Sequence, residues 1–373
     1  MNFKNQRSAA VFGALAVASA ALVACGNGAD NAADTSATDT PGSDAAVAGE
    51  YELSGETGQL LAEGASSQQN AMDYFRTVYE ADVPGATLAY NPTGSGAGVK
   101  QFLDNQVVFA GSDSPLKEEE VAKAAERCGG NEAWHLPFVI GPVAVAYNLE
   151  GVDELTLSVD NIVEIFQGVI KNWNDPKIAE SNPGVELPDQ KINVVYRADE
   201  SGTSDNFQKF LIAASDGKWE SKGKAFPTEV GSGANGSTGV ADQVANTPGA
   251  ITYVEAGFAD KIAKVDFGNG PVELNSTTVG NALAHMKFST EGHNMVVDSE
   301  ALFASKDADF YPLILTTYEI VCSAGYDAAT AGMVRDFLNV ALDSQDSELE
   351  SEGFIPVSGA HAERLREAIN AIQ

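Results

Sequence analysis

Short apolar runs alternate with segments of helical spacing along most of the chain after residue 50. The runs at 88–90, 107–110 and 192–196 are typical of short buried strands. Apolar residues at helical spacing predict helices, and these cover 99–103, 117–127, 161–167 and 330–342. Regular alternation of strands and helices predicts an α/β fold with mainly parallel sheets.

Two longer β-rich runs, 136–147 and 311–321, lie far apart in the sequence, and Gly141-Pro142 interrupts the first. We interpret them as chain crossings between two lobes. The resulting division is lobe 1, residues 50–139 plus 312–373, and lobe 2, residues 140–311. Such a layout places a ligand cleft between the lobes, and a two-strand hinge lets them close over the ligand.

The first 24 residues are typical of a secretory signal peptide. Lys4 and Arg7 form a positive segment, and the apolar run 9–23 is too short for a membrane-spanning helix. The run ends in Leu-Val-Ala-Cys, which resembles the lipobox of bacterial lipoproteins and predicts acylation of Cys25. The alternative is ordinary cleavage near Ala24, with Cys25 incidental.

Residues 25–49 follow the signal as the lipidated Cys25 and a segment of Ala, Asp, Thr, Ser, Gly and Asn. This composition offers almost nothing to bury and predicts a disordered tether. The expected location is extracytoplasmic, with the folded part anchored to the cell membrane as a lipoprotein.

Cys128 and Cys322 are the two cysteines that remain beside Cys25. Outside the cytoplasm, two remaining cysteines are more often paired than free, so we predict a Cys128–Cys322 disulfide, with free thiols as the alternative. No metal site is expected, because the chain has no CxxC motif and its four histidines are scattered. We interpret these as surface or capping residues: His135, His285, His293 and His361.

The formal net charge is −31, and loss of Lys4 and Arg7 leaves 20 basic against 53 acidic residues, or −33. This balance argues against nucleic acid as a partner and against polybasic contact with a membrane. It also repels anions at long range. An anion site in this chain therefore has to act through short, oriented hydrogen bonds.

The segment from Arg197 to Thr203 combines a guanidinium, a nearby carboxylate at Asp199 and the turn Ser201-Gly202-Thr203. The turn lies between a predicted strand and a predicted helix, whose N-terminus offers unpaired N–H groups and a partial positive charge. Together these groups suit an oxyanion. Asp199 either orients and partly neutralises the guanidinium or is only a turn residue.

Two further Ser/Gly turns precede predicted helices upstream. One is 64–68, with Ser66 and Ser67, and the other is 94–98, with Ser95. Glycine allows close approach of the backbone, and serine can cap a helix or donate its hydroxyl. Each turn alone is explained by helix capping, but three of them with one arginine favour convergence on a single anion.

Asp113 follows the predicted strand 107–110 and precedes the helix predicted from Lys117. One interpretation is that it caps this helix. The other is that its carboxylate accepts a hydrogen from a protonated ligand oxygen. Because an ionised carboxylate cannot donate, it attracts a protonated oxyanion and disfavours one that has no hydrogen to give.

These segments together resemble the substrate-binding proteins of bacterial phosphate ABC transporters over most of the chain after residue 50. The matching pieces are Gly-Ala-Ser-Ser at 64–67, Thr-Gly-Ser-Gly-Ala-Gly-Val-Lys at 93–100, Phe-Ala-Gly-Ser-Asp-Ser-Pro-Leu at 109–116, Ile-Phe-Gln-Gly at 165–168, Trp-Asn-Asp-Pro at 173–176, Asn-Pro-Gly at 182–184, Leu-Pro at 187–188, Arg-Ala-Asp-Glu-Ser-Gly-Thr at 197–203 and Thr-Pro-Gly-Ala-Ile-Thr-Tyr-Val-Glu at 247–255.

The resemblance implies a type II periplasmic-binding-protein fold, with two lobes, a two-strand hinge and a cleft between the lobes. It also implies roles for single residues. The phosphate-binding positions are Ser66 and Ser67 in the first loop, Ser95 as the cap of the second helix, Asp113 as the acceptor, Arg197 coupled to Asp199, and Ser201, Gly202 and Thr203 in the third loop. The family often has an aromatic residue at position 67, whose backbone N–H makes the contact, so a side-chain role of Ser67 stays open.

The function expected from the resemblance is high-affinity binding of inorganic phosphate and its delivery to the permease and ATPase subunits of a membrane ABC transporter. We expect a monomer without a cofactor. The alternatives are a receptor for another tetrahedral oxyanion (arsenate, phosphite or sulfate) and a phosphate sensor or scavenger. An enzyme is not expected: residues 93–100 fail the P-loop pattern because Gln101 follows Lys100, and no GxSxG elbow precedes an Asp and a His in order.

Overall fold

The computed structural model describes residues 51–373. The predicted signal peptide, the predicted acylation site Cys25 and the predicted tether lie outside the described residues. The described residues all belong to one contact unit, so the lobe boundaries near 140 and 312 remain predictions. Within this range, no helix has both the length and the apolar character required to cross a membrane.

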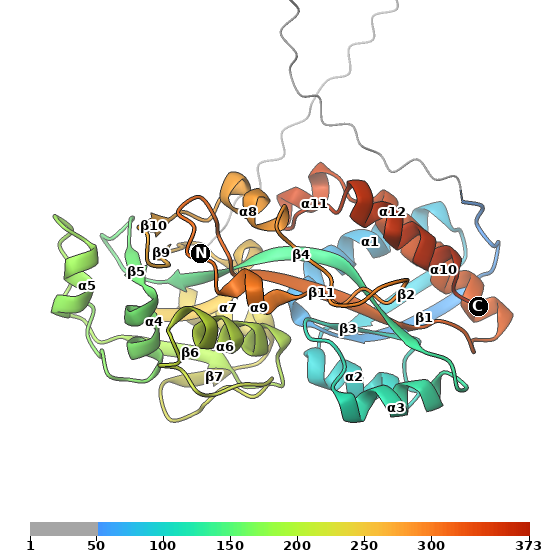
Figure 1. Cartoon of the computed structure of the whole chain (residues 1–373), viewed down its shortest axis with the longest axis horizontal. Coiled ribbons are helices and arrows are strands. Elements are labelled where there is room, and N and C mark those ends of the chain that lie inside the picture. Colours follow the sequence, from blue (N-terminus) through green and yellow to red (C-terminus); the bar gives the residue numbers. More distant parts are fainter. Residues whose placement is uncertain (1–50) are drawn as a thin grey trace, which may run out of the picture. The chain divides into compact units, whose positions relative to one another are not determined.

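An eight-stranded sheet runs through the described residues in the order β2-β1-β3-β11-β4-β8-β6-β7 (Figure 1). Its strands are β1 (Gly58–Gly64), β2 (Ala86–Asn91), β3 (Phe109–Ser112), β4 (Ala133–Tyr147), β6 (Asn193–Arg197), β7 (Ser232–Ala234), β8 (Ala250–Glu255) and β11 (Ile314–Cys322). A second, three-stranded sheet comprises β5 (Thr156–Ser158), β9 (Lys264–Asp266) and β10 (Pro271–Val272). The α/β class is as predicted.

Strand β4 joins the two ends of the large sheet. Its first part pairs with β11 as far as Pro142, and its last five residues, from Val143, pair with β8. The interruption predicted at Gly141-Pro142 is wrong. The proline lies where the strand changes partner, a position at which its missing N–H is tolerated.

The expectation of mainly parallel sheets is only partly correct. Strands β1, β2 and β3 run parallel, as do β6, β7 and β8. The long strands β4 and β11 are antiparallel to each other and to their outer neighbours. The sheet is therefore mixed, because the two long strands carry the chain in opposite directions between its ends.

Helices cover both ends of the sheet (Figure 1). They are α1 (Gln69–Asp82), α2 (Ser95–Leu103), α3 (Glu118–Arg127), α4 (Val159–Phe166), α5 (Pro176–Ser181), α6 (Gly202–Ala214), α7 (Gly236–Ala245), α8 (Ser276–Leu283), α9 (Ser299–Phe303), α10 (Ala328–Asp343), α11 (Ser347–Ser351) and α12 (Gly359–Asn370), with short 3-10 turns η1 (Ser66–Gln68) and η2 (Ala256–Phe258). Helix α1 shows why they form: it buries Ala71, Met72, Phe75 and Tyr79, which share one face at helical spacing.

An aromatic cluster fixes helix α6 against the sheet. Phe207 stacks on Tyr253 of β8 with 4.4 Å between ring centroids, and Phe166 and Phe226 pack edge-on and tilted around this pair. Truncating one such buried phenylalanine costs about 3–5 kcal/mol. The first turn of α6 is thus held in a set position relative to the ends of β6 and β8.

The sulfur atoms of Cys128 and Cys322 are bonded in the structure, with Cα atoms 5.4 Å apart. Cys128 is the C-cap of α3 and Cys322 ends β11, so the bond joins a helix end to a strand end 194 residues away. Both cysteines are fully buried.

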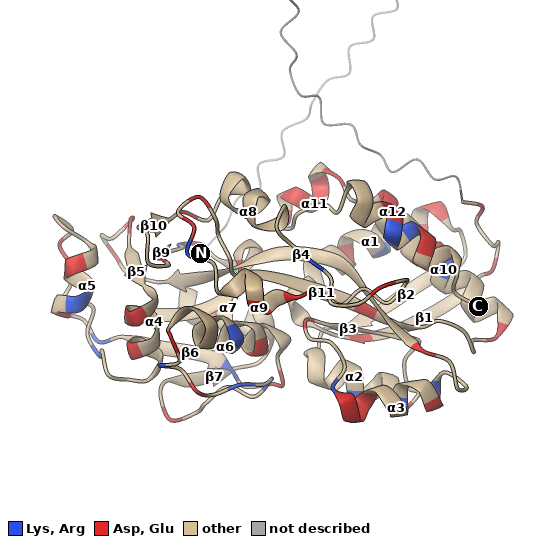
Figure 2. Cartoon of the chain, viewed as in Figure 1, with Lys and Arg blue, Asp and Glu red and all other residues tan. Residues whose placement is uncertain are grey.

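Acidic side chains dominate the exposed helices at both ends of the sheet, and Lys and Arg are sparse among them (Figure 2). Helix α3, for example, begins with Glu118, Glu119 and Glu120. Carboxylates are favourable at this end of a helix, because its N-terminus carries a partial positive charge. The acidic composition is thus accommodated on the surface.

Candidate functional site

Several strands end in loops that meet near the middle of the large sheet. Strands β1, β3, β6 and β8 end at Gly64, Ser112, Arg197 and Glu255. The three Ser/Gly turns predicted from the sequence connect β1 to η1, β2 to α2 and β6 to α6. Ligands of α/β proteins bind outside the carboxyl ends of strands, so these loops form the candidate site.

The first loop lies directly on the end of β3. Gly64 has φ +151°, and a Cβ added there would lie 2.0 Å from the Gly111 carbonyl oxygen. Only glycine allows this approach. As a result, Ser67 lies beside Asp113, and the preceding Ser66 lies beside Ser237.

Asp113 accepts hydrogen bonds from three hydroxyl groups. Ser67 and Thr317 donate to Oδ1 at 2.6 and 2.7 Å, and Ser95 donates to Oδ2 at 3.2 Å. Its side chain is buried, with 4% of the residue exposed. The capping interpretation is wrong, since Lys117 is the N-cap of α3. A carboxylate with three hydroxyl donors is better paired than it would be at a solvated helix end.

Burial raises the pKa of Asp113, and the neighbouring Glu255 carboxylate raises it further. The hydrogen bonds from Ser67 and Thr317 and the charge of Arg197 oppose this change. The resulting pKa is about 6. At neutral pH the Asp113 carboxylate is therefore ionised and can only accept.

Ser95 does not cap the second helix, contrary to the expectation. It is the first residue of α2, after the N-cap Gly94, and it makes no side-chain capping bond. Its hydroxyl instead accepts from the Asp113 backbone N–H at 3.1 Å while donating to the Asp113 carboxylate. A charge-assisted bond to a carboxylate is stronger than a neutral capping bond, which explains the choice.

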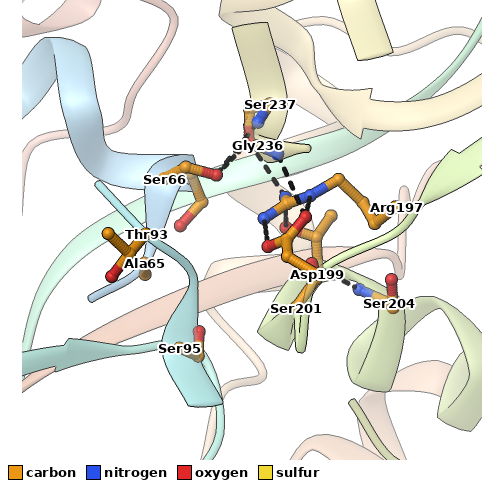
Figure 3. Close-up of polar contacts among 12 residues, drawn as sticks. Ala65, Ser66, Thr93, Ser95, Arg197, Asp199, Ser201, Ser204, Gly236 and Ser237 are labelled. Atoms are coloured by element: carbon orange, nitrogen blue, oxygen red, sulfur yellow. Dashed lines mark hydrogen bonds and ion pairs between the residues drawn. The ribbon is translucent and has the colours of Figure 1, made fainter. Parts of the chain in front are cut away.

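Arg197 ends β6 and is almost fully buried, with 2% exposed. Asp199 accepts from its Nε at 2.8 Å and from its Nη2 at 2.5 Å, so the carboxylate holds one edge of the guanidinium (Figure 3). Burial alone lowers the pKa of Arg197, but Asp199 outweighs this and raises it. The free edge, at Nη1, faces Thr203 Oγ1 at 3.4 Å and Ser237 Oγ at 3.3 Å.

The third loop is held by its own cap and by a close contact. Ser201 is the N-cap of α6 and accepts from the Ser204 N–H at 3.2 Å. A Cβ added at Gly202 would lie 2.5 Å from both Ser95 Oγ and Asp113 Cβ. Position 202 therefore has room only for glycine, and the start of α6 lies against Asp113.

Sequence reasoning missed four residues of this network: Ser237, Thr317, Asn206 and Glu255. Ser237 is in the first turn of α7, where its N–H donates to Ser66 Oγ at 2.9 Å (Figure 3). The preceding Gly-Ser-Gly-Ala-Asn-Gly, 231–236, is a fourth Ser/Gly turn before helical spacing, and it could have been found by the same criterion. Thr317 lies inside an apolar strand and has no such signal.

Glu319 of strand β11 pairs with Gly111 of β3 and lies behind the first loop. It is fully buried, and among the described residues neither of its carboxyl oxygens has a hydrogen-bond partner. Burial raises the pKa of Glu319 well above its usual value, which favours the neutral form of the group. The Gln68 side chain beside it donates to Tyr90 Oη at 3.0 Å, and Tyr90 donates to the Ala65 carbonyl at 2.7 Å, which braces the loop.

All eight predicted ligand positions are thus brought together. A single network of hydrogen bonds and close contacts joins the first, second and third loops through Asp113, Arg197 and Ser237. It combines one guanidinium, several hydroxyls, the starts of four helical segments and a buried acceptor. Such a set can hold a tetrahedral oxyanion and can demand a hydrogen from it.

Comparison with known proteins shows the family to which the chain belongs. A model of the PBP superfamily domain matches residues 35–345. Phosphate-binding protein PstS 3 of Mycobacterium tuberculosis is 41% identical over 99% of this chain and 100% of its own. PstS 2 of the same organism is 40% identical, again over 99% of this chain and 100% of its own.

Solved structures show the same fold. One is a high-affinity periplasmic phosphate-binding protein bound with phosphate, with a TM-score of 0.64 and 23% identity over 83% of this chain and 93% of that one. Another is a phosphate-binding protein from Stenotrophomonas maltophilia, with a TM-score of 0.61 and 22% identity over 83% and 94%. The chain has the type II periplasmic-binding-protein fold, and it belongs to the PstS family of phosphate-binding proteins within the PBP superfamily.

Proposed function

We propose that this protein binds inorganic phosphate outside the cytoplasm and delivers it to the membrane subunits of an ABC transporter. The observation that carries the proposal is the convergence of a buried acceptor, Asp113, and a buried guanidinium, Arg197, on one set of loops. The 41% identity to a mycobacterial phosphate-binding protein over nearly the whole chain supports it.

In the proposed complex, Arg197 supplies the positive charge. Asp199 fixes its orientation through two parallel hydrogen bonds, leaving Nη1 for the anion. Bonds from a guanidinium to phosphate are charge-assisted and stronger than neutral ones. The hydroxyls of Ser66 and Ser201, together with the backbone N–H groups of Ser67, Ser95, Gly202 and Thr203, complete the shell.

Asp113 gives the site its choice of anion. Phosphate near neutral pH keeps at least one proton and can donate to this carboxylate, whereas sulfate has none and meets it lone pair to lone pair. Arsenate has the same protons and shape as phosphate, so we expect it to compete. Among the alternative functions, that of a sulfate receptor is therefore disfavoured.

We further propose that the division into lobes, 50–139 plus 312–373 and 140–311, describes two bodies that close over phosphate. Three hydrogen bonds across this boundary support it. Gly96 N–H donates to the Glu200 carbonyl at 2.9 Å, Asn206 Nδ2 to the Asp113 carbonyl at 2.6 Å, and Ser114 Oγ to Asp205 Oδ2 at 2.6 Å. Strands β4 and β11 are the proposed hinge, since they are the two central strands of the large sheet and β4 continues from β11 to β8.

The partners follow from this role: phosphate, the permease and ATPase subunits of the transporter, and the membrane through acylated Cys25. We propose a monomer that uses no cofactor, binds no nucleic acid and catalyses no reaction. Delivery to a transporter requires only reversible capture.

Calorimetric titration tests the proposal. The exported protein in mild detergent is titrated with phosphate, arsenate, phosphite and sulfate. We expect tight, saturable binding of phosphate, competition by arsenate and no binding of sulfate. If phosphate produces no saturable heat while another of these anions does, the phosphate assignment is wrong.

A further inference from the structure

Glu255 is a second buried carboxylate beside the guanidinium of Arg197. It ends β8, the parallel neighbour of β6, which Arg197 ends. Glu255 is 2% exposed, and Thr203 Oγ1 donates to its Oε1 at 2.5 Å. Its other oxygen, Oε2, is buried and has no hydrogen-bond partner among residues 51–373. A buried carboxylate oxygen without a donor is costly, so its retention needs a reason.

The direction of the hydrogen bond from Thr203 to Glu255 limits which anions can bind beside them. A threonine hydroxyl has one hydrogen, and here Glu255 receives it. While that bond is made, Thr203 Oγ1 offers only lone pairs, one of which faces Arg197 Nη1. Thr203 Oγ1 and Glu255 Oε2 are therefore both acceptors. An anion oxygen placed next to them has to bring a hydrogen of its own.

The charges around Glu255 also favour an anion that carries its own hydrogens. Arg197 and Asp199 neutralise each other, which leaves Asp113 and Glu255 as two further carboxylates. The titratable groups on the elements packed against β8 are Tyr196 and Arg197 on β6, Asp205 and Lys209 on α6, Asp242 on α7, and His135 and Tyr147 on β4. Lys209 is paired with Asp205, and Asp242 is exposed, so neither alters the balance. A doubly charged anion would meet two buried carboxylates with one proton to share.

We propose that Glu255 is a second hydrogen-bond acceptor for the bound anion, so that the site selects phosphate in its singly charged form with two protons. This inference rests on the proposed phosphate binding. One ligand hydrogen is donated to Asp113, and the other to Glu255 Oε2 or to Thr203 Oγ1.

The test is the pH dependence of phosphate affinity above neutrality, measured by calorimetry on the exported protein in mild detergent. If only the two-proton form binds, the apparent affinity falls about tenfold for each pH unit, because one proton is linked to binding. In Glu255→Gln the amide can donate to the anion, which removes the demand for the second hydrogen, and the fall becomes less than about threefold per unit. Asp113, with a pKa of about 6, is ionised throughout this range in both proteins.

Asp336→Asn is the matched control. Asp336 lies on helix α10 and is also buried. It accepts hydrogen bonds from the N–H and the hydroxyl of Ser54, near the start of the described residues and away from the anion site. This variant loses the same charge, and we expect it to keep the native slope. A native affinity that holds constant or rises with pH overturns the inference, as does a native slope in Glu255→Gln. If that variant does not fold, the native slope alone decides. Absence of phosphate binding by the native protein at every pH refutes the proposed function instead.

Discussion

The hydroxyl of Ser67 donates a 2.6 Å hydrogen bond to the carboxylate of Asp113. This bond commits the only hydrogen of the hydroxyl, so Ser67 can contact an anion through its backbone N–H but not by donating from its side chain. The structure thus explains how serine can stand where the family often has an aromatic residue. Under the proposed function we therefore expect Asp113, and not Ser67, to be the side chain that discriminates between anions.

Asp113→Asn is expected to weaken the rejection of sulfate. A site that hydrogen-bonds a ligand O–H can reject an analogue lacking it by ~10⁴-fold or more, and an amide can rotate to donate instead. Phosphate affinity itself changes little, because the substitution also relieves repulsion between carboxylate and anion. The measurement is competition by sulfate against labelled phosphate. Equal rejection of sulfate by variant and native protein would show that another residue selects the anion.

Asp113 also predicts a pH-dependent stability in the absence of phosphate. Its pKa is raised from 3.8 to about 6, so the folded protein binds more protons than the unfolded chain between these values. The contribution of Asp113 is present below about pH 4 and is lost as pH rises through about 6, by about 3 kcal/mol in all. Asp113→Asn should therefore gain stability relative to native protein as pH rises from 4 to 7. Urea unfolding at both ends of the range measures the difference, and a pH-independent difference would contradict it.

Arg197→Ala is expected to nearly abolish phosphate binding. Losing one partner of a buried charge-assisted pair costs ~2–5 kcal/mol, or roughly 30- to several-thousand-fold in affinity. Because the single variant also leaves the partly buried Asp199 without its partner, Arg197→Ala with Asp199→Ala is the matched comparison. Calorimetry should show both to be defective, with the fold checked by circular dichroism. A dissociation constant within about threefold of native would remove Arg197 from the site.

No free thiol is expected at Cys128 or Cys322 in protein exported from its native host. Replacing both by serine should lower the free energy of unfolding by about 2–5 kcal/mol, because the bond closes a long loop of 194 residues. Thiol counting under denaturing conditions and urea unfolding measure the two effects. Two reactive thiols in exported protein would contradict the pairing.

Cys25→Ala tests the anchor. If Cys25 is acylated, the variant is released into the medium or accumulates as an unprocessed precursor in the native host. Fractionation followed by immunoblotting distinguishes these products. Full retention in the membrane at unchanged mature size would show that Cys25 does not hold the protein there.

Local sequence patterns predicted most of the helices and strands and many of the residues of the candidate site. The helix after Ser201 could be predicted because a capping residue and apolar residues at helical spacing occur together. The first loop could be predicted because the close packing at position 64 requires a glycine, which appears in the sequence as part of a Ser/Gly turn. Long-range pairing was not readable in the same way. That β4 and β11 lie side by side with opposite directions depends on contacts about 180 residues apart, which no local pattern encodes.

Thr317 and Glu255, which sequence reasoning missed, and Ser95, which it misassigned, share one cause. Thr317 and Glu255 reach the site only because their strands are neighbours of β3, β4 and β6 in the sheet. Ser95 has the sequence context of a cap, but tertiary contact with Asp113 offers its hydroxyl a stronger partner. The role of a polar side chain was thus predictable where its partner is local and not where the partner comes from another strand.

The hydrogen bonds from Ser114 to Asp205 and from Asn206 to the Asp113 backbone have a kinetic consequence. If phosphate binds at the buried Arg197 and Asp113 between the proposed lobes, we expect it to leave only after these bonds break. Release then has a rate set by a unimolecular opening step, independent of phosphate concentration. A membrane subunit that breaks these two contacts when the protein docks on it would accelerate release without contacting the anion. Docking on the transporter and release of phosphate would then be coupled.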